Sequence, residues 1–236
     1  MPDDAAISDP VTGMRAAVVA RLWGELQRVR PEGRALIALD GFDGVGKTHL
    51  ARELAEHADA VGGRALVSVG IDGFHRPRAE RLRAGAGPEG FYRGSYRYRA
   101  FFEHVVDPLR FGEAVVPAIW DVARDEPVPK RPRDVPPTGI VVVDGIFLHR
   151  PELVDIWDDS VWVSAPFSVT VPRGNARFPR RGDDDPESPA NRRYVEGQRM
   201  YLREADPESH AGWLFDNTDL DRPSLRHGLA EAAAQA

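Results

Sequence analysis

A glycine-rich segment, residues 41–48, carries the residue types best suited to binding a polyphosphate. It reads Gly-Phe-Asp-Gly-Val-Gly-Lys-Thr and matches the spacing G-x-x-x-x-G-K-[ST]. Glycines allow successive backbone N–H groups to turn toward an anion, and the lysine adds positive charge. The hydroxyl of Thr48 could bind a magnesium ion beside the phosphates. The residues predicted to bind a nucleotide are Gly41, Asp43, Gly44, Val45, Gly46, Lys47 and Thr48.

The segments on both sides of this loop are those that a phosphate site requires. Residues 35–39 are all apolar, as expected for a strand buried on both faces of a parallel sheet. Residues 48–60 are predicted to form a helix, whose N-terminal N–H groups and dipole favour an anion. Residues 65–69 are predicted to be a second strand. Asp72 follows it and should lie at the carboxyl edge of the sheet, where doubly wound folds bind ligands.

A second acid follows the most apolar strand of the sequence. Residues 140–143 read Ile-Val-Val-Val and are followed by Asp144, so we predict an interior strand that ends in a carboxylate. A carboxylate at that position could bind magnesium opposite Thr48. The alternative is an acid that caps the turn into the next helix.

Composition limits the classes of function. A chain of 236 residues with 42% hydrophobic residues fits one α/β domain. The net charge of −6 argues against a nucleic-acid-binding surface, and the absence of cysteine excludes disulfides and thiolate metal sites. No run of about 18 apolar residues and no basic-apolar leader is present, so we expect neither membrane insertion nor export, and a cytoplasmic location. The seven histidines show no zinc-binding spacing.

The rest of the chain is predicted to form a single domain. We expect residues 1–10 to be disordered, residues 11–29 to form a lead-in helix, residues 34–220 to form the core and residues 227–236 to be a frayed tail. Further strands are predicted at 114–120, 160–164 and 211–215, further helices at 101–109, 151–157 and 191–205, and an extended proline-rich loop at 126–137.

Two arginine-rich stretches could contact an anionic ligand. Residues 77–98 mix arginines with aromatic residues, which suits either a loop over an anionic or planar ligand or a solvated connection. Residues 173–187 combine arginines, glycines and then acids, which suits a mobile lid that brings guanidinium groups to a transferring phosphoryl group. Arginine-rich surface loops are common, so the second pattern is weak by itself.

The order of these segments resembles the uridine kinase, phosphoribulokinase and pantothenate kinase group of P-loop kinases. The resemblance extends over about residues 34–220. It implies a three-layer α/β/α sandwich with a mainly parallel central sheet and an arginine-bearing lid, and the transfer of phosphate from ATP, with Mg²⁺, to a small-molecule hydroxyl acceptor. The matching segments are 41–48, Asp72-Gly73-Phe74-His75, Trp120-Asp121, Asp144-Gly145-Ile146 and 173–181.

The resemblance also implies roles for individual residues. Asp72 would be the general base for the acceptor hydroxyl, and Lys47 and Arg177 would neutralise charge on the transferring group, with Arg173 and Arg181 behind Arg177. Thr48 and Asp144 would bind the magnesium ion. Asp72 could instead be a turn residue, because Asp-Gly is a common turn pair. The predicted acceptor-binding residues are Asp72, Phe74, His75, Tyr92, Arg97, Trp120, Asp121 and Arg173.

The sequence departs from the uridine kinase pattern at the acceptor. Arg97 stands where these kinases have an acid expected to hold ribose hydroxyls, and no histidine follows Trp120-Asp121 at the position associated with pyrimidine recognition. Asp144 stands where the group often has Glu, which shortens the reach to the metal. An arginine suits an acceptor that carries a carboxylate or phosphate. A nucleoside is therefore only the first hypothesis, beside pantothenate-like or sugar-phosphate acceptors.

Other hypotheses remain at this stage. A nucleotide-binding regulatory protein could keep the loop without catalysis, whereas a GTPase-like switch would need an N-K-x-D motif that Asn217-Thr218-Asp219 does not provide. The Asp216-Asn217 pair could contact a nucleotide base, although an ordinary Asx turn is the favoured interpretation. We expect no nucleic-acid partner and no membrane partner, and either a monomer or a homodimer.

Overall fold

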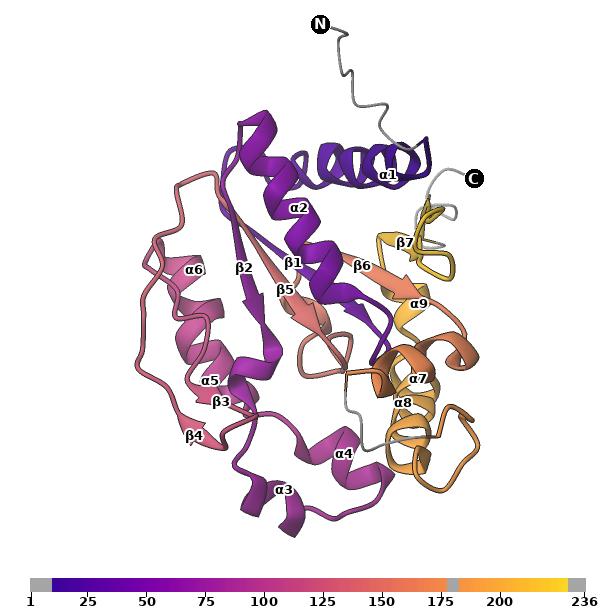
Figure 1. Ribbon diagram of the computed structural model, residues 1–236. Coiled ribbons are helices and arrows are strands. Elements are labelled where there is room, and N and C mark those ends of the chain that lie inside the picture. The colour runs from indigo at the N-terminus through magenta and orange to yellow at the C-terminus, as the bar shows by residue number, and fades with distance from the viewer. Residues whose placement is uncertain (1–9, 178–182, 229–236) are drawn as a thin grey trace, which may run out of the picture.

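A six-stranded sheet forms the centre of the computed structural model, which describes residues 10–177 and 183–228 (Figure 1). The strand order is β2-β5-β1-β6-β7-β8; the first five strands are parallel and β8 is antiparallel to β7. Helices flank this sheet, as predicted for a three-layer α/β/α sandwich. The strands are β1 (Ala35–Gly41), β2 (Leu66–Gly70), β5 (Ile140–Gly145), β6 (Asp159–Ser164), β7 (Trp213–Asp216) and β8 (Ser224–His227).

The two most apolar strands occupy the interior of the sheet. Every residue of β1 is buried, and β5 is buried except for a partly exposed Asp144. The pairing of β1 with β5 runs from Ala35 opposite Ile140 to Asp40 opposite Gly145. Because these strands are parallel, their carboxyl ends lie at one edge, with Asp144 opposite Leu39 and Gly145 opposite Asp40. The predicted interior position of β5 is confirmed, since it pairs with β2 as well.

The N-terminal helices follow the sequence prediction with shifted ends. Helix α1 (Pro10–Leu26) ends three residues before the predicted Val29, and helix α2 (Lys47–Val61) follows the phosphate loop. Leu22, Trp23 and Leu26 are fully or almost fully buried, so α1 is part of the core. Figure 1 shows α1 packed beside one end of α2. In the described part of the chain, no helix has the length and apolarity needed to span a membrane.

The prediction between the second and fifth strands was wrong in several places. Residues 77–98 are not a loop, because they contain helices α3 (Arg78–Arg83) and α4 (Pro88–Gly94). The predicted strand 114–120 reduces to the two residues of β3, since Pro117 cannot donate to a strand ladder. The other elements are the 3₁₀ turn η1 (Ile71–Phe74), helix α5 (Tyr98–Phe101), the π-helical turn η2 (Phe102–Val106), helix α6 (Asp107–Phe111) and the antiparallel pair β3 (Trp120–Asp121) and β4 (Glu126–Pro127).

The C-terminal part also differs from the predicted boundaries. Residues 151–157 contain only the 3₁₀ turn η3 (Val154–Ile156) in place of a helix. Strand β8 extends the sheet beyond the predicted core end at residue 220, and its residue His227 was assigned to the tail. Residues 1–9 and 229–236 lie outside the described residues, and with them most of the predicted disordered N-terminus and tail. The remaining helices are α7 (Phe167–Asn175), α8 (Arg192–Ala205) and α9 (Pro207–His210).

A buried carboxylate joins the end of β1 to three other segments. The Asp40 side chain is 0% exposed, and its Oδ2 accepts hydrogen bonds from the backbone N of Leu148 at 3.1 Å and from the Tyr201 hydroxyl. His149 Nδ1 lies 2.7 Å from the same oxygen, while its Nε2 lies 2.8 Å from Ser160 Oγ. Buried polar groups of this kind stabilise a fold only when each has its partner. The network fixes the residue that directly precedes the phosphate loop.

We expect the Asp40→Ala variant to be less stable than the native protein by about 3 kcal/mol or more, because its buried partners would lose their acceptor. Urea unfolding measures this difference. Asp59→Ala is the matched control, since Asp59 is exposed on α2. A loss in Asp40→Ala no larger than in the control would contradict the importance of the network.

Candidate functional site

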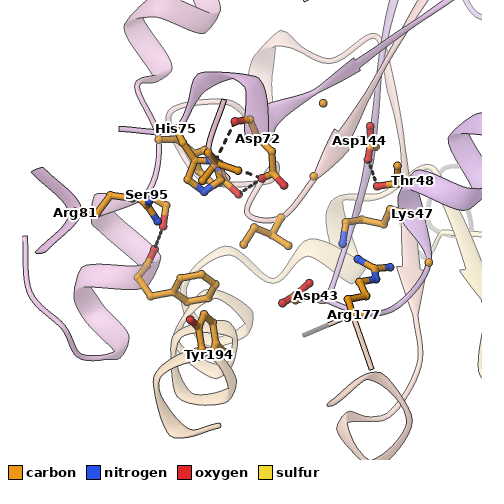
Figure 2. Close-up of a pocket in the computed structure, with 18 of the residues that line it drawn as sticks. Asp43, Lys47, Thr48, Asp72, His75, Arg81, Ser95, Asp144, Arg177 and Tyr194 are labelled. Carbon is orange, nitrogen blue, oxygen red and sulfur yellow. Dashed lines mark hydrogen bonds and ion pairs between the residues drawn. The ribbon is translucent and has the colours of Figure 1, made fainter. Parts of the chain in front are cut away.

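One cavity of about 540 Å³ lies where β1, β2 and β5 end (Figure 2). The phosphate loop and the start of α2 line one part of it, and η1, α4 and α8 line the rest. Ligand sites of doubly wound sheets are expected at this edge. The polar and charged side chains in the lining are Asp43, Lys47, Thr48, Asp72, His75, Arg81, Ser95, Tyr96, Asp144, Arg177, Arg193 and Tyr194.

The phosphate loop fits closely between its neighbours. Gly44 has a φ of +78°, and a Cβ there would lie 2.2 Å from the carbonyl oxygen of Thr170 on α7. Gly46 has a φ of +102°, and a Cβ would lie 2.7 Å from the side-chain nitrogen of Asn217. Only glycine adopts this backbone without strain and also leaves the required space. The motif glycines are therefore explained by both conformation and packing.

Asn217 supports this loop from the end of β7. The side chain is fully buried, its Nδ2 donates to the Val45 carbonyl at 2.7 Å, and its Oδ1 accepts from Arg15 of α1 at 2.9 Å. Arg15 also pairs with Glu53 of α2 at 2.7 Å. The favoured Asx turn is present next to it, since Asp216 Oδ1 accepts from the Thr218 backbone N at 2.8 Å.

Lys47 lies at the base of the loop with its ammonium group turned to the loop backbone. Its Nζ donates to the carbonyls of Gly41 at 3.0 Å and Phe42 at 2.7 Å. Burial lowers the pKa of Lys47, and the negative charges of Asp43 and Asp40 oppose that shift. The predicted phosphate-binding lysine thus lines the cavity beside several carboxylates.

Thr48 and Asp144 form the pair that fits a magnesium ion. Thr48 Oγ1 donates to Asp144 Oδ2 at 2.6 Å, and Figure 2 shows the two side chains meeting at the cavity wall. Burial raises the pKa of Asp144, whereas the Thr48 hydrogen bond and Lys47 lower it. No group of three or more His, Cys, Asp or Glu side chains within residues 10–177 and 183–228 could hold a metal alone. Mg²⁺ bound with phosphates needs only one or two protein oxygens, so this pair fits it.

Asp72 projects into the cavity from η1 and is held by two aromatic residues. Its side chain is 69% exposed, and its Oδ1 accepts a 3.0 Å hydrogen bond from the Tyr96 hydroxyl. His75 Nδ1 lies 3.5 Å from the same oxygen, and its ring packs edge-on against Tyr96 at 4.5 Å (Figure 2). Burial raises the pKa of Tyr96 well above its usual value, so the hydroxyl keeps its proton and remains a donor. The carboxylate is both accessible and oriented.

Several predicted site residues do not line the cavity. Gly41 and Val45 act through their carbonyls, which accept from Lys47 and Asn217. Phe74 is completely buried against Phe101. Tyr92 is 1% exposed, packs on Phe147 and Tyr201, and belongs to the core. For Phe74 and Tyr92, hydrophobic burial explains the aromatic side chain without a ligand.

The predicted acceptor clamp at Arg97 is occupied by interactions within the protein. Arg97 Nε donates to the His75 carbonyl at 3.2 Å, and the guanidinium group stacks over the Trp120 ring at 5.1 Å from its centroid. Asp121 Oδ1 accepts from the backbone N of Ala123 and Arg124 in an Asx turn. Arg97, Trp120 and Asp121 do not line the cavity, and the contacts found for them are within the protein.

The predicted lid is described only at its ends. Arg173 belongs to α7 and donates to the carbonyls of Asn217 and Thr218 at 2.8 Å each, away from the cavity. Arg177 follows α7, is exposed and lines the cavity. Residues 178–182, including Arg181, lie outside the described residues.

Of the lining residues that were not named as site residues from the sequence, five have polar or charged side chains: Arg81, Ser95, Tyr96, Arg193 and Tyr194. Tyr96 and Arg81 belong to the arginine- and aromatic-rich stretch 77–98, and that composition was the signal available for them. Arg193 and Tyr194 come from α8, about 100 residues later, where no local motif marks them.

Comparison with solved structures identifies the fold. A possible uridine kinase from Bacillus stearothermophilus superposes with a TM-score of 0.68 at 19% identity, over 85% of this chain and 98% of the other. A putative fructose transport system kinase from Silicibacter sp. TM1040 gives 0.64 at 25% identity, over 81% and 95%. D-glycerate 3-kinase from Cryptococcus neoformans var. grubii gives 0.55 at 11% identity, over 89% and 96%. No protein-family profile and no curated protein sequence matches the chain.

The chain has the fold of the uridine kinase-like P-loop kinases. The structural neighbours are matched over 95% to 98% of their own length, so the likeness extends over their whole fold. Within this P-loop kinase fold, the segments that carried the resemblance divide into two groups. Most of the phosphate loop lines the cavity, together with Asp72 and Asp144, whereas Arg97, Trp120 and Asp121, which were assigned to the acceptor, do not.

We predict that Asp144→Asn makes the nucleotide-free protein more stable at neutral pH. The folded-state pKa of Asp144 is raised by burial, so the ionised carboxylate costs stability above that pKa and the cost disappears as the pH falls through it. The Tm gain should therefore shrink from about pH 7.5 to about pH 4. Thermal unfolding with a chelator present measures it, and Asp59→Asn on the exposed face of α2 is the control. If Asp144→Asn were less stable than the native protein at neutral pH, the expected direction of the stability change would be wrong.

Proposed function

We propose that the protein is a kinase that uses ATP and Mg²⁺ to phosphorylate a hydroxyl group of a small metabolite. The observation that supports this most directly is that the Asp72 carboxylate lines the same cavity as the phosphate loop. A loop that only bound nucleotide would need no oriented carboxylate there. Tyr96 and His75 hold this one in place, which favours catalysis over a purely regulatory nucleotide-binding role.

The chemistry follows from the positions of the residues. The loop N–H groups and the start of α2 would bind the β- and γ-phosphates of ATP, with Lys47 adding positive charge. Thr48 and Asp144 would hold Mg²⁺, which neutralises phosphate charge when bound. Arg177 lines the same cavity and would add a guanidinium group to the transferring phosphoryl group.

Asp72 would act as the general base. Its carboxylate would accept the proton of the acceptor hydroxyl as that oxygen forms a bond to the γ-phosphorus, while the bond from phosphorus to the bridging oxygen breaks and ADP leaves. The Tyr96 hydrogen bond leaves Oδ2 of Asp72 available to the acceptor, because the tyrosine bonds Oδ1. His75 is favoured in its neutral form, since burial lowers its pKa although Asp72 opposes the shift. Its Nδ1 lies 3.0 Å from the Asp72 backbone carbonyl, so a neutral His75 would brace the turn that carries Asp72 without a permanent ion pair.

The structural neighbours agree with a phosphotransferase but do not name one acceptor. They are a possible uridine kinase, a putative fructose transport system kinase and a D-glycerate 3-kinase. A nucleoside acceptor was the first hypothesis from the sequence, with pantothenate-like and sugar-phosphate acceptors as alternatives. The histidine that the pattern associates with pyrimidines is absent after Asp121, which weakens the nucleoside hypothesis.

We predict that Asp72→Asn lowers kcat by about 10²- to 10⁴-fold, because the amide cannot accept the acceptor proton. Affinity for ATP should stay nearly unchanged, since Asp72 is not part of the phosphate loop. Coupled ADP release across nucleosides, pantothenate, sugar acids and sugar phosphates measures turnover, and equilibrium titration measures ATP binding.

Asp121→Asn is the control for this experiment, because Asp121 lies in an Asx turn outside the cavity. It should retain activity. Acceptor-dependent turnover that survives in Asp72→Asn would contradict the general-base assignment, and a native protein that fails to bind ATP would overturn the proposed function itself.

A further inference from the structure

The cavity has a cationic part on the side of Asp72 away from the phosphate loop. In Figure 2, Arg81 and Ser95 lie opposite Lys47 and Thr48, with Asp72 and His75 between them. Phe91, Tyr96, Tyr194 and Arg193 also line the cavity, and Arg193 contacts the connection between α3 and α4, where its guanidinium group donates to the Ala86 carbonyl. In the proposed reaction the acceptor would occupy this part, because Asp72 must reach its hydroxyl from there while the phosphate loop holds the nucleotide.

The positive charge of Arg193 has no ion-pair partner among the described residues. Its guanidinium group donates to the Ala86 carbonyl at 2.8 Å, and no carboxylate of the described residues lies within 4.0 Å of it. It lies in the first turn of α8, which contains no acidic residue. A positive charge at a helix N-terminus opposes the helix dipole. A neutral donor could make the same bond to Ala86, so stability does not explain an arginine here.

Arg81, on the neighbouring helix α3, brings a second guanidinium group to the lining of the same cavity. Its Nε donates to the Arg76 carbonyl at 3.0 Å, and its Nη2 forms a long ion pair with Asp125 Oδ1 at 4.0 Å. Its side chain is only 23% exposed. The charge of Arg81 also contributes to lowering the pKa of His75, which places it near the pair that holds Asp72.

We propose that Arg81 and Arg193 form a subsite for a carboxylate or phosphate group of the acceptor, so that the substrate is an anionic hydroxylated metabolite. This inference rests on the proposed kinase function and specifies its substrate class. Guanidinium groups are matched to both anions by their planar arrangement of donors. The anion would be held away from the phosphate loop while a hydroxyl of the same molecule faces Asp72. The sequence assigned this role to Arg97, whose guanidinium group is stacked on Trp120.

The test measures binding without turnover. The nucleotide site is first saturated with Mg²⁺ and a non-hydrolysable ATP analogue, so that anions cannot bind the phosphate loop. Calorimetric titrations then compare two matched pairs, D-glycerate with glycerol and ribose 5-phosphate with ribose. We expect the anionic member of at least one pair to bind about tenfold or more tightly than its neutral partner, and the responding pair distinguishes carboxylate from phosphate.

Variants identify the residues responsible. Arg81→Gln and Arg193→Gln should each weaken binding of that anion by about tenfold or more, while binding of the ATP analogue stays unchanged and shows that the variants are folded. Arg192→Gln is the control, because Arg192 is adjacent on α8, is exposed and does not line the cavity. Equal binding of charged and neutral partners, no binding of either anion, or an equal loss in Arg192→Gln would overturn the subsite.

ADP release on the same four compounds separates this inference from the proposed function. Turnover of a neutral compound without any preference for its anionic partner would support the kinase and overturn the subsite. Anion binding that is lost in both arginine variants, with no turnover of any acceptor in a wider panel, would support the subsite and count against the kinase.

Discussion

The structure depends on the way the end of β1 is fixed before the phosphate loop begins. Asp40 is completely buried, and its carboxylate accepts hydrogen bonds from Leu148 in the segment after β5 and from Tyr201 of α8. It also contacts His149, whose ring contacts Ser160 of β6. The next residue, Gly41, starts the loop. The positions of Lys47 and Thr48 are therefore set by a polar network beneath them and by Asn217 beside them. A loop with this support can be preorganised for an anion at little entropic cost.

The nucleotide edge could be predicted from the sequence because its determinants are local. The glycine spacing, the apolar strand before it and the helix after it all lie within about 30 residues. Asp72 and Asp144 could be placed as well, because Asp72 comes two residues after β2, Asp144 lies near the end of β5, and parallel strands end at one edge. These two predictions required only that the strands be parallel, and no knowledge of which side chains pack together.

The acceptor side could not be predicted in the same way because it depends on contacts between distant segments. Arg97 looked like an anion clamp, but its stacking on Trp120 depends on β3, which the sequence did not define correctly. Tyr96 reaches Asp72 from 24 residues away, and Arg193 enters the cavity from a helix that starts after β6. An arginine-rich composition shows that guanidinium groups are available, but only the packing decides which ones face a ligand and which ones brace the fold.

Helix α1 has a consequence for where the functional unit begins. By sequence it is a lead-in that precedes the core, yet Arg15 binds Asn217, and Asn217 holds the carbonyl of Val45 in the phosphate loop. The buried side chains of Leu22, Trp23 and Leu26 also show that this helix is part of the hydrophobic core. A shortened chain that starts at β1 would keep every residue of the glycine motif but lose the brace that shapes it. The phosphate loop is therefore supported from both ends of the chain, through Arg15 and Asn217, and its shape depends on the whole fold.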